Sequence, residues 1–471
     1  MLKIYNTETR KKEAITLAEG EKLLKMYTCG PTIYNYAHIG NFRTYVFEDL
    51  LRRTLKYFAF PLKQVMNLTD VEDKTILAAK EKGIPLREHT KIYKEAFFED
   101  LKTLGIEPAE IYSPATDYVP EMIAMIETLI KKGYAYQGQD QGVYYSIKHF
   151  PSYGRLSHLK LDDLQTGASE RLTHDEYDKE SASDFVLWKP YDPERDGEVF
   201  WDSPFGKGRP GWHVECSAMA TKLLGETIDI HVGGVDNIFP HHENEIAQSE
   251  GCTGKHFVRH WIHAEHLIVD GKKMSKSLGN FFTLRDLLAK GYTGPEVRYL
   301  LLSTHYRTQL NFTLEGLEAA RQTLNRLRDF IRRLRSAKAQ EGGSVASYLE
   351  KAQKTFKEAL SDDLNISSAL AALFDLIRPI NALIDASKMT AQEGQNVLFF
   401  LKDLDCVLGV LPLEEEVVEI PPEVQKAFEK REVARKAKNW EEADKERDFI
   451  HAKGYQIEDS PEGSRVIKST G

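Results

Sequence analysis

The sequence predicts an α/β fold: a parallel-sheet domain that is split by an insertion and followed by an all-α helical bundle and a small C-terminal α+β module. Three observations support this prediction. A strand, a glycine-bearing turn, a helix and a second strand follow one another between residues 23 and 68. A further strand, Thr227–Gly234, also ends in glycines. Beyond residue 284 the apolar residues recur mainly at helical spacing.

The first of these patterns is a βαβ unit. Leu23–Thr28 is typical of a buried strand, apolar residues follow helical spacing from Ile39, and Pro61–Leu68 is typical of a second strand. Such units build parallel sheets, whose ligands bind at the carboxyl ends of the strands. We therefore assign residues 1–120 to this domain, and residues 208–265, which contain the later strand, to its second half.

The remaining regions differ from the sheet domain in composition and in the spacing of their apolar residues. Glu121–Lys132 has helical spacing, Val143–Ile147 resembles a strand, and a polar stretch runs to Gly197, so we interpret residues 121–207 as a connecting insertion. Residues 266–310 would carry a lysine-rich loop, residues 311–410 a helical bundle, and residues 420–471 the C-terminal module. The helical patterns cover Leu284–Leu302, Leu314–Leu334, Tyr348–Leu360, Ala369–Ala386 and Ala391–Leu408.

Composition limits the class of protein. The chain has 471 residues with 41% hydrophobic content, enough for sizeable cores. We find no run of about 18 apolar residues that could span a bilayer and no secretory signal at the start, so we expect a cytoplasmic location and no membrane partner. The four cysteines are scattered and form no CxxC pair, which predicts reduced thiols. Among them, we predict that Cys406 is a small, buried apolar residue, and Cys252 has no assigned role.

The net charge of −9 gives no general attraction to nucleic acid, so such a partner would need local basic patches. Arg321–Lys338 contains seven basic residues against Asp329, and Lys430–Lys438 contains five against Glu432. Either patch could be a solvated helix face or a phosphate-binding surface. Trp440 follows the second patch, where it could stack on an unpaired base or anchor a small core.

Two segments far apart in the sequence suit polyphosphate. Asp270–Asn280 places three lysines among glycine and hydroxyl residues, and Cys29–Thr32 leads to His38–Asn41 at the start of a helix, where backbone N–H groups favour anions. Each segment alone could be structural: the first a solvated turn, the second an N-cap histidine. Together they predict one ATP site, with Lys273 and Lys276 stabilising the charge on departing pyrophosphate.

These segments resemble known signatures. Lys273–Ser277 reads KMSKS and His38–Asn41 resembles HIGH, the two signatures of class I aminoacyl-tRNA synthetases, although Asn41 replaces the last histidine. Thr28–Thr32, Gly211–Met219 and Phe239–Glu245 are strongly similar to cysteinyl-tRNA synthetases in particular. The resemblance runs over essentially the whole chain. It implies a class I Rossmann-like catalytic domain and an anticodon-binding C-terminal module.

The resemblance also implies one Zn²⁺ per chain. Its ligands would be Cys29, Cys216, His241 and Glu245. Spacing alone supports only the last two, which lie four apart on one helix face, and the alternative is inert thiols beside an exposed acidic helix. Zinc would prefer a substrate thiolate to the hydroxyl of serine, so we predict no editing domain. His242, beside a ligand, could support the site or lie on the surface.

The activity implied is that of a cysteine–tRNA ligase, which activates L-cysteine with ATP and Mg²⁺ and transfers it to the 3′ end of tRNA(Cys). The enzyme would be monomeric. Alternatives are an enzyme that passes activated cysteine to a small amine, and a zinc- and RNA-binding protein without catalysis.

The resemblance also implies site residues. The ATP-binding residues would be Gly30, His38, Asn41, Lys273 and Lys276, and all of these except Gly30 would be catalytic. The amino-acid pocket would comprise Thr69, Trp212, His231 and Asp236, the last facing the ammonium group. Candidate tRNA contacts are Arg321, Arg328, Arg332, Arg335 and Trp440.

Overall fold

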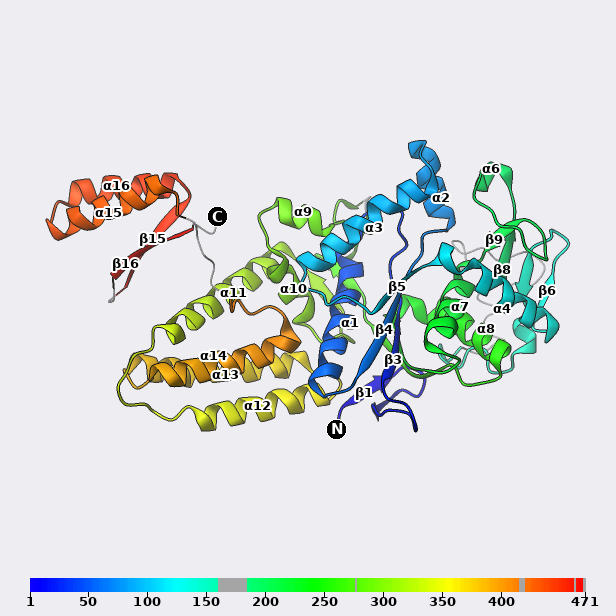
Figure 1. The fold of residues 1–471 in the computed structure, drawn as a ribbon, viewed down its shortest axis with the longest axis horizontal. Helices are drawn as coiled ribbons and strands as arrows, with labels where there is room; N and C mark the ends of the chain where they lie inside the picture. Colours follow the sequence, from blue (N-terminus) through cyan, green and yellow to red (C-terminus); the bar gives the residue numbers. More distant parts are fainter. Residues whose placement is uncertain (160–183, 276–277, 415–419, 461–462, 469–471) are drawn as a thin grey trace. The chain divides into compact units, whose positions relative to one another are not determined.

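A five-stranded parallel sheet organises the N-terminal part of the chain (Figure 1). Its strand order is β11-β10-β3-β4-β5, and every neighbouring pair is parallel. The strands are β3 (Leu24–Thr28), β4 (Leu62–Leu68), β5 (Ile111–Pro114), β10 (Ile228–Gly234) and β11 (Val258–Ala264). The α/β fold class predicted from the sequence is confirmed, and three of these strands begin within one residue of the predicted position.

The computed structural model describes residues 1–159, 184–275, 278–414, 420–460 and 463–468. The chain forms two units, Met1–Leu411 and Pro412–Gly471, and each is described by itself. The domain boundaries inside the first unit stay a prediction. A short antiparallel hairpin, β1 (Lys3–Asn6) and β2 (Lys11–Ala14), opens the first unit.

The strand order reverses at β3. The chain passes from β3 through α1 (Ile39–Tyr57) to β4 on one side, whereas β10 pairs with the other side of β3. Alternate residues of β3 point to opposite faces: Leu24 and Met26 pack with Leu51 of α1, and Tyr27 packs in the other core. A parallel sheet opens a crevice at such a reversal, at the carboxyl ends of the strands.

Several helices and turns connect the strands of this sheet. They are α2 (Asp73–Lys82), α3 (Leu86–Thr103), η1 (Ala115–Tyr118), α4 (Val119–Lys131), α7 (Trp212–Leu224), η3 (Val235–Asn237), η4 (Ile238–His242) and α8 (Glu243–Thr253). Helices α4, α7 and α8 contribute apolar side chains to the same core as Tyr27, including Met122, Val214 and Ile246.

The predicted insertion, together with the three residues after it, contains a four-stranded antiparallel sheet in the order β6-β7-β8-β9. Its elements are β6 (Ala135–Gln137), β7 (Val143–Tyr145), η2 (Ile147–His149), β8 (Phe185–Pro190), α6 (Pro193–Asp196) and β9 (Gly208–Pro210). We predicted a polar stretch up to Gly197, and β8 corrects this, because Phe185, Leu187 and Trp188 are buried. Six apolar-rich residues between charged segments were too short a signal to stand out.

The region after the sheet is helical, as predicted, but the predicted stretch Leu284–Leu302 is broken into two helices at residues 290–293. It contains α9 (Leu284–Ala289), α10 (Gly294–Leu302), α11 (Leu314–Arg335), α12 (Ala346–Ser361), α13 (Ile366–Asp385) and α14 (Ala391–Leu408). A small sheet, β13 (Lys272–Lys273), β12 (Leu267–Val269) and β14 (Leu310–Phe312), lies before and between them in the sequence. Cys406 is exposed, which makes the predicted burial wrong: helical spacing directs Leu404, Val407 and Leu408 inward instead.

One helix, α13, is long and apolar enough to cross a membrane by length and composition. This qualifies the expectation that no such segment exists. Ile366, Leu373 and Ile380 of this helix are buried in the protein, and its neighbour is α12. A core helix of a bundle passes the same test, so α13 is weak evidence for a membrane.

The second unit is a helical hairpin followed by a β-hairpin. Its elements are α15 (Pro422–Lys436), α16 (Trp440–Ala452), β15 (Tyr455–Ser460) and β16 (Gly463–Lys468). Val424, Ala427, Ile450 and Val466 form its core.

Candidate active site

The predicted pocket residues meet at the reversal of the sheet. Cys29 directly follows β3, Thr69 directly follows β4, and Asp236 lies in the turn after β10. Thr69 is buried and its backbone bonds hold the two loops together: its N–H donates to Pro31 (3.1 Å), and its carbonyl accepts from Ile33 (2.9 Å). The carboxyl ends of three strands therefore supply one site.

The four predicted metal ligands converge. One donor atom from each of Cys29, Cys216, His241 and Glu245 lies within 4.8 Å of the others, and all four residues are buried. They come from four segments: the end of β3, helix α7, the η4 turn and helix α8. The alternative of an exposed acidic helix is wrong, because Glu245 has no exposed side-chain surface.

The charges in this cluster are those that a cation requires. Burial raises the pKa of Glu245, but His231 and His241 outweigh it and lower that pKa to about 2. A hydrogen bond from Cys29 lowers the pKa of Cys216 to about 6. Burial lowers the pKa of His241, whereas Glu245 and Cys216 raise it to about 10. The protonated His241 imidazole thus carries the positive charge that a bound metal ion would supply in its place.

A second set of donors overlaps the first. Cys29, His231, His242 and Glu245 also lie within 4.8 Å of one another. His231 Nε2 is 2.9 Å from Glu245 Oε2, and His242 Nε2 is 3.2 Å from Cys29 Sγ. His242 is buried, so of its two predicted roles the surface role is wrong.

Two histidines that we did not predict support the cluster. His263 Nε2 lies 2.8 Å from His242 Nδ1, and His213 Nδ1 lies 2.9 Å from His241 Nδ1. Thr7 Oγ1 is bonded in turn to His263 Nδ1 (2.7 Å). His213 lies within the Gly211–Met219 motif, which could have revealed it. His263 ends a strand next to β10, and only the strand order places it at the site.

The donor set fits zinc. Two thiols, an imidazole and a carboxylate are zinc ligands, and metal-bound imidazoles usually bond a second group through their other nitrogen, as His241 does here with His213. Trp212 covers this side of the cluster: its ring stacks on that of His241 with centroids 4.4 Å apart. A tryptophan that only filled a core would not need to stack its ring on a candidate metal ligand, as Trp212 does on His241.

The nucleotide side of the site is the start of α1. His38 is the N-cap residue: its Nδ1 accepts from the Asn41 N–H (3.1 Å), and Asn41 Oδ1 accepts from the His38 N–H (3.1 Å). The structural interpretation of His38 as an N-cap residue is therefore confirmed, and a helix N-terminus of this kind favours anions. Gly30 is required for packing, since an added Cβ would lie 1.8 Å from the Asn67 carbonyl oxygen.

The lysine loop lies against this helix start. Ile39 donates its N–H to Phe282 (3.0 Å), and His38 forms a β-bridge with Thr283. A Cβ on Gly40 would be 3.3 Å from the Met274 side chain. Lys273 is exposed at the end of the small strand β13. Lys276 lies outside the described residues. The two phosphate-directed segments are thus neighbours, as one ATP site requires.

The imidazole of His38 gives a pH prediction. Burial lowers the pKa of His38 to about 4, below the value of about 6.5 in an unfolded chain. Between these values the unfolded state binds the proton and the folded state does not, so stability falls as pH falls. At pH 5 we expect this residue to cost up to about 2 kcal/mol relative to pH 7.

Urea unfolding of the wild type and His38→Asn at pH 7 and pH 5 measures this cost. Asparagine keeps an N-cap but has no titrating group. The variant should therefore lose up to about 2 kcal/mol less stability on acidification. An equal loss in both proteins would show that His38 titrates normally in the folded state.

The basic surface on α11 differs in part from the prediction. Arg321 bonds within the protein: it donates to Glu296 (3.1 Å) and to the Gly291 carbonyl (2.7 Å), and it lies over the ring of Tyr292. Arg328, Arg332 and Arg335 are half-buried or exposed. A groove of about 750 Å³ runs between α11 and α13. It is lined by the arginines Arg326, Arg333 and Arg378, with Leu327, Phe330, Phe374 and Ile377 among its apolar residues.

In the second unit, Trp440 is 60% exposed at the start of α16. It is not part of the apolar core of this unit, so the reading of Trp440 as a core anchor is wrong.

Comparison with known proteins gives matches along nearly the whole chain. Residues 16–322 match the model of the tRNA synthetases class I (C) catalytic domain, and residues 355–412 match the DALR domain. A cysteine–tRNA ligase of Protochlamydia amoebophila is 60% identical over 99% of this chain and 98% of the relative. The cysteine–tRNA ligase of Chlamydia felis is 58% identical with the same coverage.

A solved structure shares the fold at low identity. It is the methionyl-tRNA synthetase of Mycobacterium tuberculosis bound by methionyl-adenylate, which has a TM-score of 0.62 and 13% identity over 82% of this chain and 92% of that chain.

Proposed function

Because this chain belongs to the cysteine–tRNA ligases, a family of class I aminoacyl-tRNA synthetases, we propose a role in the reaction for each element of the site. The enzyme uses ATP to activate cysteine and transfers it to tRNA. The observation that carries our assignment is the convergence of four buried zinc-type donors beside the start of α1 and the lysine loop. Two chemistries, recognition of a thiol and binding of triphosphate, then share one crevice.

Cys29, Cys216, His241 and Glu245 would hold one Zn²⁺, in preference to the overlapping set, because two thiols suit this metal better than one. When bound, zinc supplies a soft Lewis acid that prefers a thiolate to a protonated hydroxyl. Direct recognition of this kind could provide roughly the 10⁴–10⁵ selectivity against serine that other synthetases obtain by editing.

The chain's own residues orient the amino acid. Asp236 is exposed to the crevice and close enough to His38 to influence its pKa, so its carboxylate can accept hydrogen bonds from the substrate ammonium next to the nucleotide. His231 is held by Glu245 and stacks on Trp261, which fixes its ring at the pocket floor. Trp212 and Thr69 would form the walls.

The start of α1 would bind ATP, delivered with Mg²⁺. The helix N-terminus favours phosphate. His38, neutral at pH 7, and Asn41 use His38 Nδ1 and Asn41 Oδ1 as acceptors in the cap, so His38 Nε2–H and Asn41 Nδ2–H can donate hydrogen bonds to the nucleotide. Gly30 keeps the approach open. As cysteine attacks the α-phosphate, Lys273 and Lys276 would stabilise the departing pyrophosphate.

For the nucleic-acid partner we propose tRNA(Cys), contacted by Arg328, Arg332 and Arg335 and by the second unit. Arg321, the fourth arginine of this surface, also bonds Glu296 and Gly291 within the protein. The cytoplasmic location and the monomeric state stay predictions.

Trp440→Ala tests the role of the second unit. Base–aromatic stacking is worth about 1–3 kcal/mol, so the KM for tRNA should rise roughly 5- to 150-fold. Cysteine-dependent pyrophosphate exchange should not change, because it needs no tRNA. Phe449→Ala, which removes an exposed aromatic from the same helix, serves as a matched control. An unchanged KM for Trp440→Ala would refute the stacking role.

Transfer of labelled cysteine to unfractionated tRNA with ATP and Mg²⁺, with labelled serine in parallel, tests the function. We expect charging by cysteine alone. Cysteine-dependent pyrophosphate exchange without charging would favour a small amine acceptor, and failure of both reactions would favour a binding protein.

A further inference from the structure

The middle of α1 contains a buried carboxylate that the reaction does not use. Asp49 lies 11 residues beyond His38 on the same uninterrupted helix, about 16 Å along its axis. Its side chain is fully buried. Because a helix of this length is stiff, whatever fixes Asp49 also fixes the helix start that carries His38 and Asn41.

Asp49 accepts two hydrogen bonds and forms an ion pair with a third group. Its Oδ1 accepts from the Glu107 N–H (2.8 Å), and its Oδ2 lies 2.7 Å from Arg53 Nε and 2.5 Å from Arg298 Nη2. Arg298, on α10, is also buried, with 1% of its side chain exposed. The carboxylate is thus the shared anion of two guanidinium groups from different helices.

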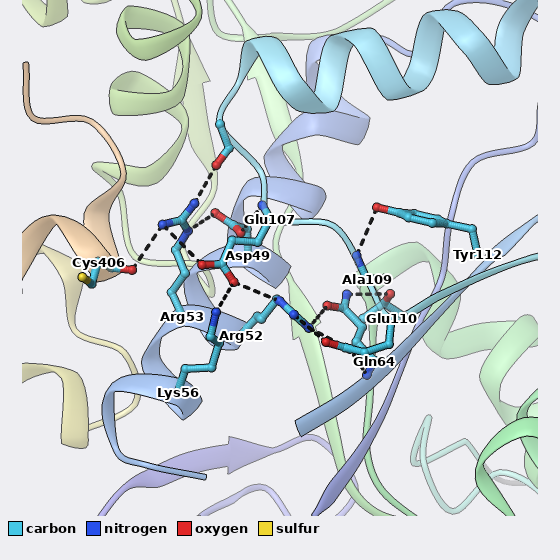
Figure 2. A network of polar contacts seen from close by, with 12 residues as sticks. Asp49, Arg52, Arg53, Lys56, Gln64, Glu107, Ala109, Glu110, Tyr112 and Cys406 are labelled. Carbon is cyan, nitrogen blue, oxygen red and sulfur yellow. Dashed lines mark hydrogen bonds and ion pairs between the residues drawn. The ribbon is translucent and has the colours of Figure 1, made fainter. Parts of the chain in front are cut away.

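The two arginines connect Asp49 to the ends of two further helices. Arg298 donates to the Leu408 carbonyl at the end of α14 (2.8 Å) and to the Leu104 carbonyl at the end of α3 (3.3 Å). Arg53 donates to the carbonyl of Cys406 on α14 (3.2 Å). These carbonyls belong to last helical turns, where orphan acceptors favour cations. Figure 2 shows Arg53 between Asp49 and Cys406.

A surrounding ion-pair network holds the loop after α3 in place. Arg52 contacts Glu107 (3.1 Å) and Glu110 (2.7 Å), and Lys56 contacts Glu107 (2.7 Å) (Figure 2). The Gln64 N–H, on β4, donates to Glu110 (2.7 Å). Asp49 joins this network to Arg298 of α10, and Arg53 joins it to α14.

We propose that Asp49 is a positioning residue that couples the tRNA-binding helices to the catalytic end of α1. The matched family segments meet here: Arg298 lies in the catalytic-domain match, and Cys406 and Leu408 lie in the DALR match. A buried ion pair contributes little net stability but enforces one geometry. When tRNA binds the bundle, this network transmits the contact to α1, so transfer, the step that needs tRNA, depends on the network more than activation without tRNA does. The inference rests on the proposed function.

Asp49→Asn tests it with two rates measured on the full-length enzyme below its melting temperature. These are cysteine-dependent pyrophosphate exchange without tRNA, and single-turnover transfer from preformed adenylate to tRNA. We expect the ratio of transfer to exchange to fall roughly 10-fold or more, since small misplacements of reacting groups have large effects on rate. A purely structural role would lower both rates with the folded fraction and leave the ratio unchanged.

Asp196→Asn is the matched control. Asp196 is also fully buried and also pairs with two arginines, Arg209 (2.9 Å) and Arg195 (2.8 Å), but it lies in the insertion. The Asp196→Asn variant should have the same ratio of transfer to exchange as the wild type, even if the melting temperature of the variant is lower.

If Asp49→Asn does not fold, Arg53→Lys provides the test. Lysine keeps the charge but lacks the extended guanidinium whose separate nitrogens contact Asp49 and the Cys406 carbonyl, so the ratio should again fall. An unchanged ratio in the folded variants, or an equal fall in Asp196→Asn, would refute the coupling. Failure of the wild type to charge tRNA would instead refute the proposed function.

Discussion

Cys216→Ser is expected to remove zinc from the protein and nearly abolish cysteine activation. Serine is close in size to cysteine but its hydroxyl stays protonated at neutral pH, so one of the two anionic sulfur donors is lost. Cysteine-dependent pyrophosphate exchange should fall by more than about 10²-fold, because loss of a group that merely supports a ligand already costs about 10–100-fold. Zinc content should fall below about 0.2 equivalents by elemental analysis.

The same variant should lose discrimination. Without zinc, the pocket meets a thiol and a hydroxyl of nearly the same shape, so most of the selectivity of roughly 10⁴ or more should disappear. Comparing the exchange rates with cysteine and with serine measures this directly. Cys252→Ser is the matched control: Cys252 is half-buried on α8, is not among the converging donors, and should keep zinc, rate and selectivity.

Circular dichroism and the melting temperature separate a local from a global effect of Cys216→Ser. The cluster joins β3, α7 and α8, so some loss of stability is expected. A folded variant that retains zinc and wild-type exchange would contradict the assignment of Cys216 as a ligand.

The fold could be predicted where the signal is local. The strand β3, the turn and α1 follow one another within 40 residues, and each has its own periodicity, so the βαβ unit was recognisable. The strand β8 was not, because only a short apolar segment marks it between charged stretches. Burial of Cys406 was mispredicted because a run of apolar neighbours does not reveal which helix face each one occupies.

The metal cluster shows more clearly what residue spacing in the sequence cannot predict. His241 and Glu245 share a helix face at i, i+4 spacing, which sequence reasoning can detect. Cys29 and Cys216 reach them only because β10 pairs beside β3 and α7 packs on the same face, and this topology is not encoded in any spacing. Resemblance to a family supplied those two ligands. His263 was missed for the same reason, since its place follows from the pairing of β11 with β10.

Lys276→Ala is expected to lower the rate of adenylate formation by roughly 10²–10³-fold, the usual effect of losing one preorganised donor to developing charge. The KM for ATP should change much less, because the interaction strengthens only as pyrophosphate departs. Pre-steady-state measurement of adenylate formation at saturating ATP tests the rate, and equilibrium binding of ATP tests the ground state.

The described residues on either side of Lys276 are bonded to one another. Asn280, after Lys276, bonds two residues before it. Its Oδ1 accepts from the Ser275 N–H (2.8 Å), and its Nδ2 donates to the Lys273 carbonyl (3.2 Å). The loop is therefore anchored next to the helix start that bonds Phe282 and Thr283. Lys272→Ala, which removes an exposed lysine from strand β13 outside the KMSKS motif, is the control and should keep the wild-type rate. Near-normal adenylate formation by Lys276→Ala would refute the assignment of Lys276 to stabilising the departing pyrophosphate.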